Sequence, residues 1–173
     1  MPAGEHQKGG DFLVLKVKII CIGKLKEKYW RDAAAEYMKR LSAFCKPEIV
    51  ELGEEKLPDN PSAAEIKQCL QKESEKIKKE IPAGAYVYSL QIEGKQLTSE
   101  VLAVGFQKQA VAGKSTLVFL IGSSFGLDES LKKQSDFALS FSAMTFPHQL
   151  ARIMLLEQIY RAFSINAGTK YHK

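Results

Sequence analysis

The chain alternates between two spacings of hydrophobic residues, one typical of strands and the other of helices. Residues 13–22 are apolar and β-branched with lysines alternating among them, which predicts a strand that enters a sheet. Between Trp30 and Phe44, apolar residues recur at three- and four-residue steps, so we expect an amphipathic helix that stops at Pro47. The same order repeats, with strands expected at 48–52, 86–92, 116–121 and 137–141, and helices after Ser62, after Thr98 or Ser99, over 128–135 and from Pro147 to about Phe163.

Five alternations of strand and helix indicate an α/β fold with a mainly parallel sheet and helices on both faces. The stretch 116–121 has no polar interruption, as in strands that are buried on both faces of such a sheet. A turn is expected at residues 93–95, after the strand pattern of 86–92. We expect one domain over 15–173 and interpret residues 1–14 as a disordered extension, because they resemble neither a signal nor a transit peptide.

Composition narrows the class of protein further. A hydrophobic fraction of 45% and a charged fraction of 26% over 173 residues exclude disordered and fibrous chains. No apolar stretch approaches the length of a membrane span, so we expect a cytoplasmic protein with no membrane partner. Cys21, Cys45 and Cys69 are odd in number and widely spaced, which favours core thiols in a reducing compartment over disulfides or a metal site. The net charge of +5 favours anionic partners without identifying one.

Three expected strand ends carry unusual residues, at 90–94, 122–126 and 141–147. Ligands of parallel α/β sheets bind outside the carboxyl ends of the strands, so these segments are candidates for a binding site. No GxGxxG dinucleotide motif is present. The sequence at 113–116 resembles the end of a phosphate-binding loop, but Lys108 stands where that motif requires glycine, and the segment precedes a strand instead of following one.

The segments 122–126 and 141–147 each allow two interpretations. Glycines at 122 and 126 would let a ligand approach the backbone, although a simple turn between strand and helix fits the same pattern. Apolar side chains at 141, 144 and 146 either plug the core or line a cleft for a flat apolar ligand such as adenine. His148 and Arg152 share a helix face beside this segment, where a structural role and a functional one both remain open.

The sequence from Phe141 to His148, then Arg152, the run 157–163 and the ending Tyr171-His172-Lys173 resemble the RlmH family. These are SPOUT-superfamily methyltransferases that modify a pseudouridine of 23S ribosomal RNA. The segments 23–30 and 89–95 are similar to the same family, so that the resemblance covers about residues 15–173.

The resemblance implies a C-terminal trefoil knot, a homodimer and S-adenosylmethionine as the cofactor. The implied reaction is methylation of N3 of a pseudouridine in 23S rRNA within assembled ribosomes, and it requires no metal because the sulfonium already activates the methyl group. Relatives usually have Gly-Gly after the strand, whereas this chain has Gly122-Ser123, which would weaken cofactor binding if position 123 needed a positive φ. The implied cofactor-binding residues are Leu90, Gly122, Phe141, Ser142, Ala143, Met144, Thr145 and Phe146.

A catalytic hypothesis follows from the same residues. The N3 proton of the base must leave, so a neutral histidine could accept it and a nearby cation could stabilise the resulting anion. We expect His148 and Arg152 to position the base, and Tyr171 and His172 to complete the site across the dimer. Which of these residues removes the proton is left open, and a frayed terminus is the alternative for the last two.

Three other functions remain open at this point. The chain could be a SPOUT methyltransferase that acts on another RNA, such as tRNA. It could be a ribosome-binding or assembly protein without catalytic activity, or an α/β protein without an RNA partner. Lysine and arginine cluster at residues 24–31 and 76–79, but glutamates dilute both clusters.

Overall fold

The computed structural model describes residues 14–171, so the expected N-terminal extension lies almost entirely outside the described residues. No helix in the described part of the chain is long and apolar enough to cross a membrane. In chain order the elements are β1 (Lys16–Ile22), α1 (Lys28–Leu41), β2 (Lys46–Leu52), α2 (Ala63–Glu80), β3 (Tyr86–Gln96), α3 (Ser99–Val111), β4 (Thr116–Ile121), α4 (Glu129–Gln134), β5 (Phe137–Ser140) and α5 (His148–Asn166).

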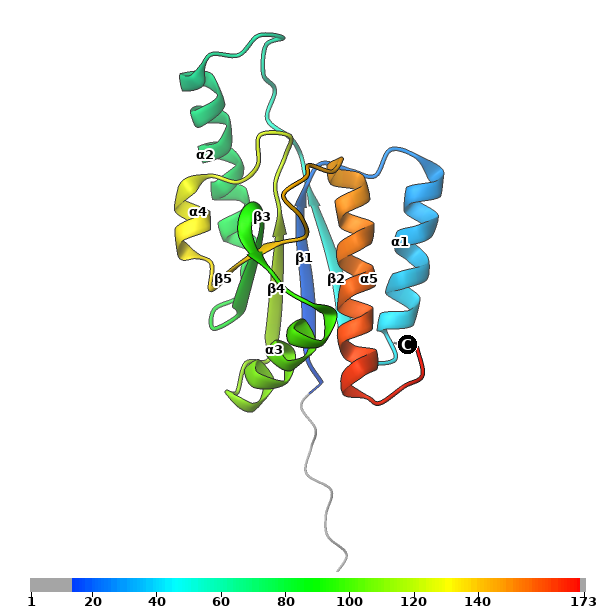
Figure 1. Cartoon of the computed structure of the whole chain (residues 1–173). Helices are drawn as coiled ribbons and strands as arrows, with labels where there is room; N and C mark the ends of the chain where they lie inside the picture. Colours follow the sequence, from blue (N-terminus) through cyan, green and yellow to red (C-terminus); the bar gives the residue numbers. More distant parts are fainter. Residues whose placement is uncertain (1–13, 172–173) are drawn as a thin grey trace, which may run out of the picture.

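The strands form one parallel sheet in the order β2-β1-β4-β3-β5 (Figure 1). The two central strands, β1 and β4, pair along nearly their whole length. Every residue of β4 is buried, as its uninterrupted apolar sequence predicts for a strand covered on both faces. The predicted α/β class with a parallel sheet is therefore confirmed.

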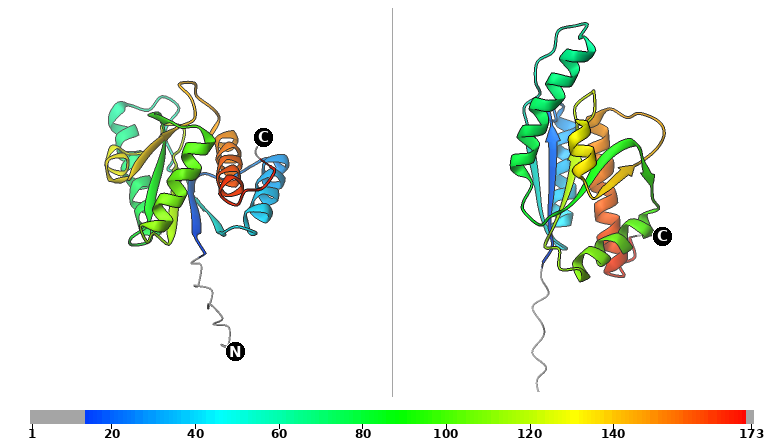
Figure 2. Two further views of the ribbon diagram at one scale, coloured as in Figure 1. Left: turned by 60° about the horizontal axis from the view of Figure 1, so that its bottom comes forward. Right: turned by 90° about the vertical axis from the view of Figure 1, so that its left-hand side faces the viewer.

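Alternate residues of the central strands face two separate hydrophobic clusters. Val17, Ile19 and Cys21 of β1 face the cluster that includes α1, α3 and α5. Ile20 and Ile22 face the smaller cluster that includes α2 and the segment around α4. The sheet thus lies between two helical layers, as predicted, and Figure 2 shows α2 on one side and α3 and α5 on the other.

Two predicted boundaries are wrong: the stop of the first helix at Pro47 and the turn after the third strand. Pro47 does not follow the first helix directly, because α1 ends at Leu41 and Pro47 lies inside β2, an edge strand that tolerates its missing N–H. The turn expected at 93–95 lies within β3, which runs on to Gln96. A register shift between Leu90 and Lys95 lets β3 bulge and then pair with β5 again, so the strand does not end at its glycine.

The segment between β5 and α5 leads the chain from one edge of the sheet to the helical layer on one of its faces. β5 lies at one edge of the sheet, whereas α5 packs against α1 and α3 on the larger cluster (Figure 1). Residues 141–147 make this return, and all of them except Ala143 line the same pocket as the loop 122–127 that follows β4. The expected trefoil knot stays a prediction.

Candidate functional site

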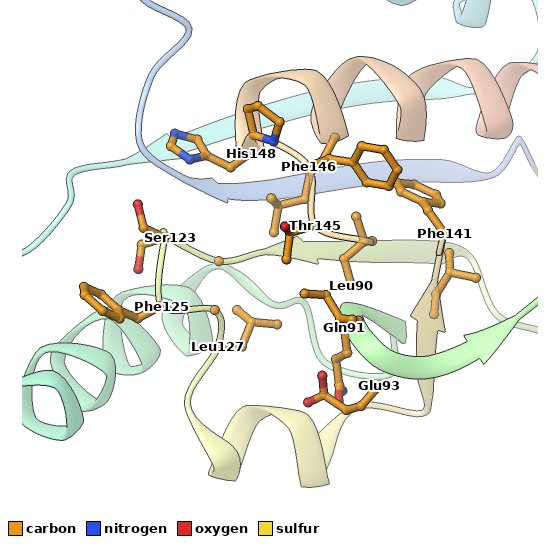
Figure 3. Close-up of a pocket in the computed structure, with 18 of the residues that line it drawn as sticks. Leu90, Gln91, Glu93, Ser123, Phe125, Leu127, Phe141, Thr145, Phe146 and His148 are labelled. Carbon is orange, nitrogen blue, oxygen red and sulfur yellow. The ribbon is translucent and has the colours of Figure 1, made fainter. Parts of the chain in front are cut away.

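A pocket of about 480 Å³ opens at the carboxyl edge of the sheet. Its walls come from the three segments that the sequence indicates: residues 90–93, the loop 122–127 after β4 and the segment 141–147 after β5. The first of these was expected to be a strand end, but it is the bulge inside β3, which continues to Gln96. Figure 3 shows Leu90, Phe141, Thr145 and Phe146 around one space, with Glu93 at one end and Ser123 at another. The carboxyl ends of parallel strands meet at one edge, which is why segments distant in sequence converge here.

The loop 122–127 is a tight turn built on two glycines. A Cβ on Gly122 would lie 2.2 Å from the carbonyl oxygen of Gly126, so only glycine fits there. Gly126 has a φ of +84° and its N–H donates to the Ser123 carbonyl oxygen at 2.8 Å. Leu127, 4% exposed, anchors the end of the loop in the smaller hydrophobic cluster.

Ser123 does not occupy the conformation that would make it unfavourable. The residues with a positive φ between 14 and 171 are all glycines, and Ser123 is not among them. The condition under which Ser123 was expected to weaken cofactor binding is therefore not met. Its hydroxyl instead donates to the Glu73 carboxylate at 2.9 Å.

The segment 141–147 is held by hydroxyl groups at its start. The Ser140 hydroxyl donates to the carbonyl oxygen of Ile92 at 2.8 Å, which ties this segment to the bulge of β3. The Met144 N–H donates to the Ser142 hydroxyl oxygen at 3.1 Å. Phe141 packs against the core and also lines the pocket, whereas Met144 and Phe146 are 73% and 37% exposed at the pocket wall. The segment therefore lines a cleft, one of its two predicted alternatives.

One end of the pocket carries an ion pair that the sequence analysis missed. Lys132 Nζ lies 2.8 Å from Glu93 Oε1, and both residues line the pocket. The hydrogen bond from Lys132 lowers the pKa of Glu93. Lys132 lies on α4, and only the pairing of β3 with β5 brings α4 beside the bulge. No local pattern around Lys132 signals this contact.

The predicted cofactor-binding residues gather at this pocket with one exception. Ala143 is not among the residues that line it. The lining also includes Ile121, Leu139 and Ala151, which the sequence predicts only as parts of strands and a helix, and Leu127, which lies between the predicted turn and helix. The predicted residues that do line the pocket are Leu90, Gly122, Phe141, Ser142, Met144, Thr145 and Phe146.

The structure separates His148 from Arg152. His148, at the start of α5, lines the rim of the pocket, with Nε2 3.9 Å from Glu54 Oε1. Arg152 is 1% exposed and does not line the pocket. Its guanidinium donates to Glu51 Oε2 at 2.6 Å and to the Gly23 carbonyl oxygen at 3.0 Å. Arg152 thus joins α5 to the ends of β1 and β2, and in this chain it offers the pocket no donor.

The described end of the chain packs far from its own pocket. The Tyr171 hydroxyl donates to Glu157 Oε2 at 3.0 Å, and the Arg161 guanidinium lies 5.1 Å from the Tyr171 ring centroid. Figure 1 shows this end beside the lower parts of α1 and α5, whereas His148 begins α5 at its upper end. His172 lies outside the described residues. Tyr171 is therefore not brought into the same chain's pocket.

Fold and pocket together define an α/β protein with a pocket of the size of small-molecule sites at the carboxyl edge of a parallel sheet. Comparison with known proteins specifies the class. The family model described as "Predicted SPOUT methyltransferase" matches residues 15–172. The chain belongs to this SPOUT methyltransferase family.

Curated relatives match the chain over their entire length. The ribosomal RNA large subunit methyltransferase H of Bifidobacterium adolescentis is 53% identical over 159 residues, which cover 92% of this chain and 100% of that protein. The protein of the same name from Streptococcus equi subsp. zooepidemicus is 50% identical with the same coverage. Among solved structures, the chain matches the crystal structure of the SpoU methyltransferase AviRb from Streptomyces viridochromogenes in complex with AdoMet. The match covers 97% of this chain and 67% of that chain, with 12% sequence identity and a TM-score of 0.45.

Proposed function

We propose that this protein is an S-adenosylmethionine-dependent methyltransferase of large-subunit ribosomal RNA, which methylates N3 of a pseudouridine in 23S rRNA of assembled ribosomes. The observation that carries this proposal is the identity of 50% or more, over their full length, to proteins named ribosomal RNA large subunit methyltransferase H. The same names favour an enzyme over a ribosome-binding protein without catalytic activity.

The pocket fits S-adenosylmethionine in size and in chemistry. A volume of about 480 Å³ lies within the range of roughly 300–1,000 Å³ that is usual for small-molecule sites. Leu90, Leu139 and Phe141 offer an apolar wall for the adenine ring, and the backbone of loop 122–127 offers polar groups to its edges. When bound, the cofactor supplies a methyl group that is activated by its positively charged sulfur.

The chain's own residues then have to orient the base and remove its proton. Since the methyl group and the leaving sulfur would both come from the cofactor, this chain would have to hold N3 in line with them and provide an acceptor for the N3 proton. His148 stands at the pocket rim, where a neutral imidazole can accept that proton. Arg152 supports this geometry as a positioning residue, because it fixes α5 against the turn at Gly23.

The tail belongs to the partner's site in this proposal. We place the chain in a homodimer, with Tyr171 and His172 of one subunit completing the pocket of the other. The packing of Tyr171 supports this arrangement, because its hydroxyl donates to Glu157 and its side chain does not line its own pocket. Deleting residues 171–173 is expected to abolish methyl transfer and to spare cofactor binding. Full methyl transfer by the truncated protein would exclude the tail from catalysis.

RNA is expected to approach at the basic loop after β1. Lys24 and Lys26 are exposed in this loop, which lies at the same edge of the sheet as the pocket. The Lys26 N–H donates to the side-chain oxygen of Gln149 at 3.2 Å, so the loop is held beside the start of α5. Lysine side chains placed there can contact phosphates without reading the sequence of the RNA.

The decisive experiment combines a binding and a transfer measurement. Calorimetric titration with S-adenosylmethionine is expected to show saturable binding. Methyl-labelled cofactor is then offered with ribosomes that lack the modification or with isolated tRNA, and labelled nucleosides are identified by mass spectrometry. Label on a 23S pseudouridine supports the proposal, whereas label on tRNA identifies a different substrate. Ribosome binding without any label would point to a protein that is not catalytic.

A further inference from the structure

Glu73 is a buried charged residue that the proposed chemistry does not use. It lies on α2 and is 2% exposed. Oε2 accepts the hydrogen bond from the Ser123 hydroxyl at 2.9 Å. Oε1 accepts from the Glu55 N–H at 3.2 Å and from the Cys69 thiol at 3.7 Å. A single carboxylate thus joins α2, the segment before it and the loop that lines the cofactor pocket.

The loop 122–127 has an open space behind it at this point. A second cavity of about 370 Å³ is lined by residues 54–57, by Cys69 and Glu73 of α2, and by residues 123–125 of the loop. Phe125, at the tip, is 49% exposed, and the anchor Leu127 comes only at the loop's end. Since Ser124 and Phe125 are exposed between these points, the hydrogen bond from Ser123 to Glu73 is well placed to determine the conformation of the loop. Figure 3 shows Ser123 and Phe125 on the side of the pocket toward α2.

We propose that Glu73 is a positioning residue for the cofactor site: through the Ser123 hydroxyl it holds the loop 122–127 in the conformation that binds S-adenosylmethionine. The proposal rests on the proposed function and extends it from the pocket to α2. A loop that populates its binding conformation for only part of the time binds with an affinity reduced by that fraction. Loss of the hydrogen bond therefore raises the dissociation constant, and a change at Glu73 does so without removing an atom that lines the cofactor pocket.

The two residues are expected to act as one unit. Ser123→Ala and Glu73→Leu each remove the hydrogen bond, and each should raise the dissociation constant roughly tenfold, the size expected for a bond to a charged group. The double variant should be no weaker than either single variant, because the same contact is already lost. Glu73→Gln should retain most of the affinity, since its amide can donate to the Ser123 hydroxyl while its oxygen still accepts from Glu55.

Ser74→Ala is the matched control. Ser74 is the next residue of α2, is 2% exposed, and its hydroxyl has no hydrogen-bond partner among the described residues. Its replacement removes a buried hydroxyl from the same helix without touching the loop. Cofactor affinity should therefore remain that of the unaltered protein.

A second readout needs no cofactor and separates this proposal from the proposed function. The Gly126 N–H is protected by its bond to the Ser123 carbonyl, so its hydrogen exchange reports the loop conformation. Exchange at Gly126 should be faster in Ser123→Ala and unchanged in Ser74→Ala. Unchanged exchange and affinity in Ser123→Ala, or additive losses in the double variant, would overturn the role of Glu73. Failure of the unaltered protein to bind the cofactor would instead overturn the proposed function. The exchange measurement would still decide whether the bond between Ser123 and Glu73 holds the loop 122–127.

Discussion

At the scale of single residues, Gly122 is the position where a side chain is least tolerable. The Cβ of an alanine would lie 2.2 Å from the Gly126 carbonyl oxygen and 2.4 Å from its carbon, both backbone atoms that cannot rotate away. We expect Gly122→Ala to displace the loop and to weaken S-adenosylmethionine binding at least tenfold, measured by calorimetry. Gly53→Ala is the matched control, because a Cβ there meets no atom within 4 Å. Equal affinities in the two variants would contradict this reading of the turn.

Arg152 is the residue whose predicted role the structure changes most. Its guanidinium is bonded to Glu51 and to the Gly23 carbonyl. Arg152→Met keeps the volume but removes the cationic partner of the partly exposed Glu51 carboxylate, so we expect the free energy of unfolding to fall by about 2–4 kcal/mol. Urea denaturation followed by circular dichroism measures this loss. If the variant unfolds like the unaltered protein but transfers no methyl group, the result would support the earlier hypothesis that Arg152 contacts the base directly.

At the scale of elements, α2 begins with a complete capping box. The Ser62 hydroxyl accepts from the Glu65 N–H at 3.2 Å, and the Glu65 carboxylate accepts from the Ser62 N–H at 3.3 Å. Figure 1 shows that this end of α2 rises beyond the strands, where tertiary packing is sparse. Ser62→Ala should cost about 1 kcal/mol, mainly as fraying of the first turn. Hydrogen exchange over residues 64–68 is expected to accelerate, whereas Ser62→Asp, which retains an acceptor, should leave it nearly unchanged.

Elements with a strong local signal were predictable, and those shaped by their neighbours were not. Ser62 and the periodic apolar residues after it placed α2 correctly, because capping and amphipathicity are local properties. β3 was expected to end near Ile92, yet it continues to Gln96 by pairing again with β5. That second pairing depends on a strand more than forty residues away, so no pattern within 86–96 could reveal it.

At the scale of the whole molecule, all three cysteines are buried, Cys21 and Cys45 within the larger hydrophobic cluster. Burial raises the pKa of Cys21 to about 12, outweighing the lowering effect of Arg152, and raises the pKa of Cys45 to about 12 as well. Their ordinary value is 9.0. The unfolded chain therefore loses these protons before the folded one does.

Stability should accordingly fall as the pH rises. The contribution of each buried thiol is fully present below pH 9.0 and is lost as the pH rises toward about 12, by at most about 1.4 kcal/mol per pH unit. Urea denaturation at pH 8 and at pH 10.5 measures this decline. Replacing both Cys21 and Cys45 with alanine should make the fall in the free energy of unfolding between these pH values smaller, whatever the effect of the replacement at pH 8. An identical decline in that variant would assign the alkaline loss to other groups.

The sequence by itself determined the parallel α/β class, the burial of β4 and the three segments that line the pocket, because periodicity and chain punctuation are properties of neighbouring residues. It did not show that the first of these segments is a bulge inside β3 and not a strand end. Only the tertiary structure decided which polar groups meet. It brought Lys132 to Glu93 and bonded Ser123 to Glu73, and it turned Arg152 away from the pocket toward Glu51. Contacts of this kind join residues that are 39 to 101 positions apart, and the strand order and return path that create them arise only when the sheet assembles.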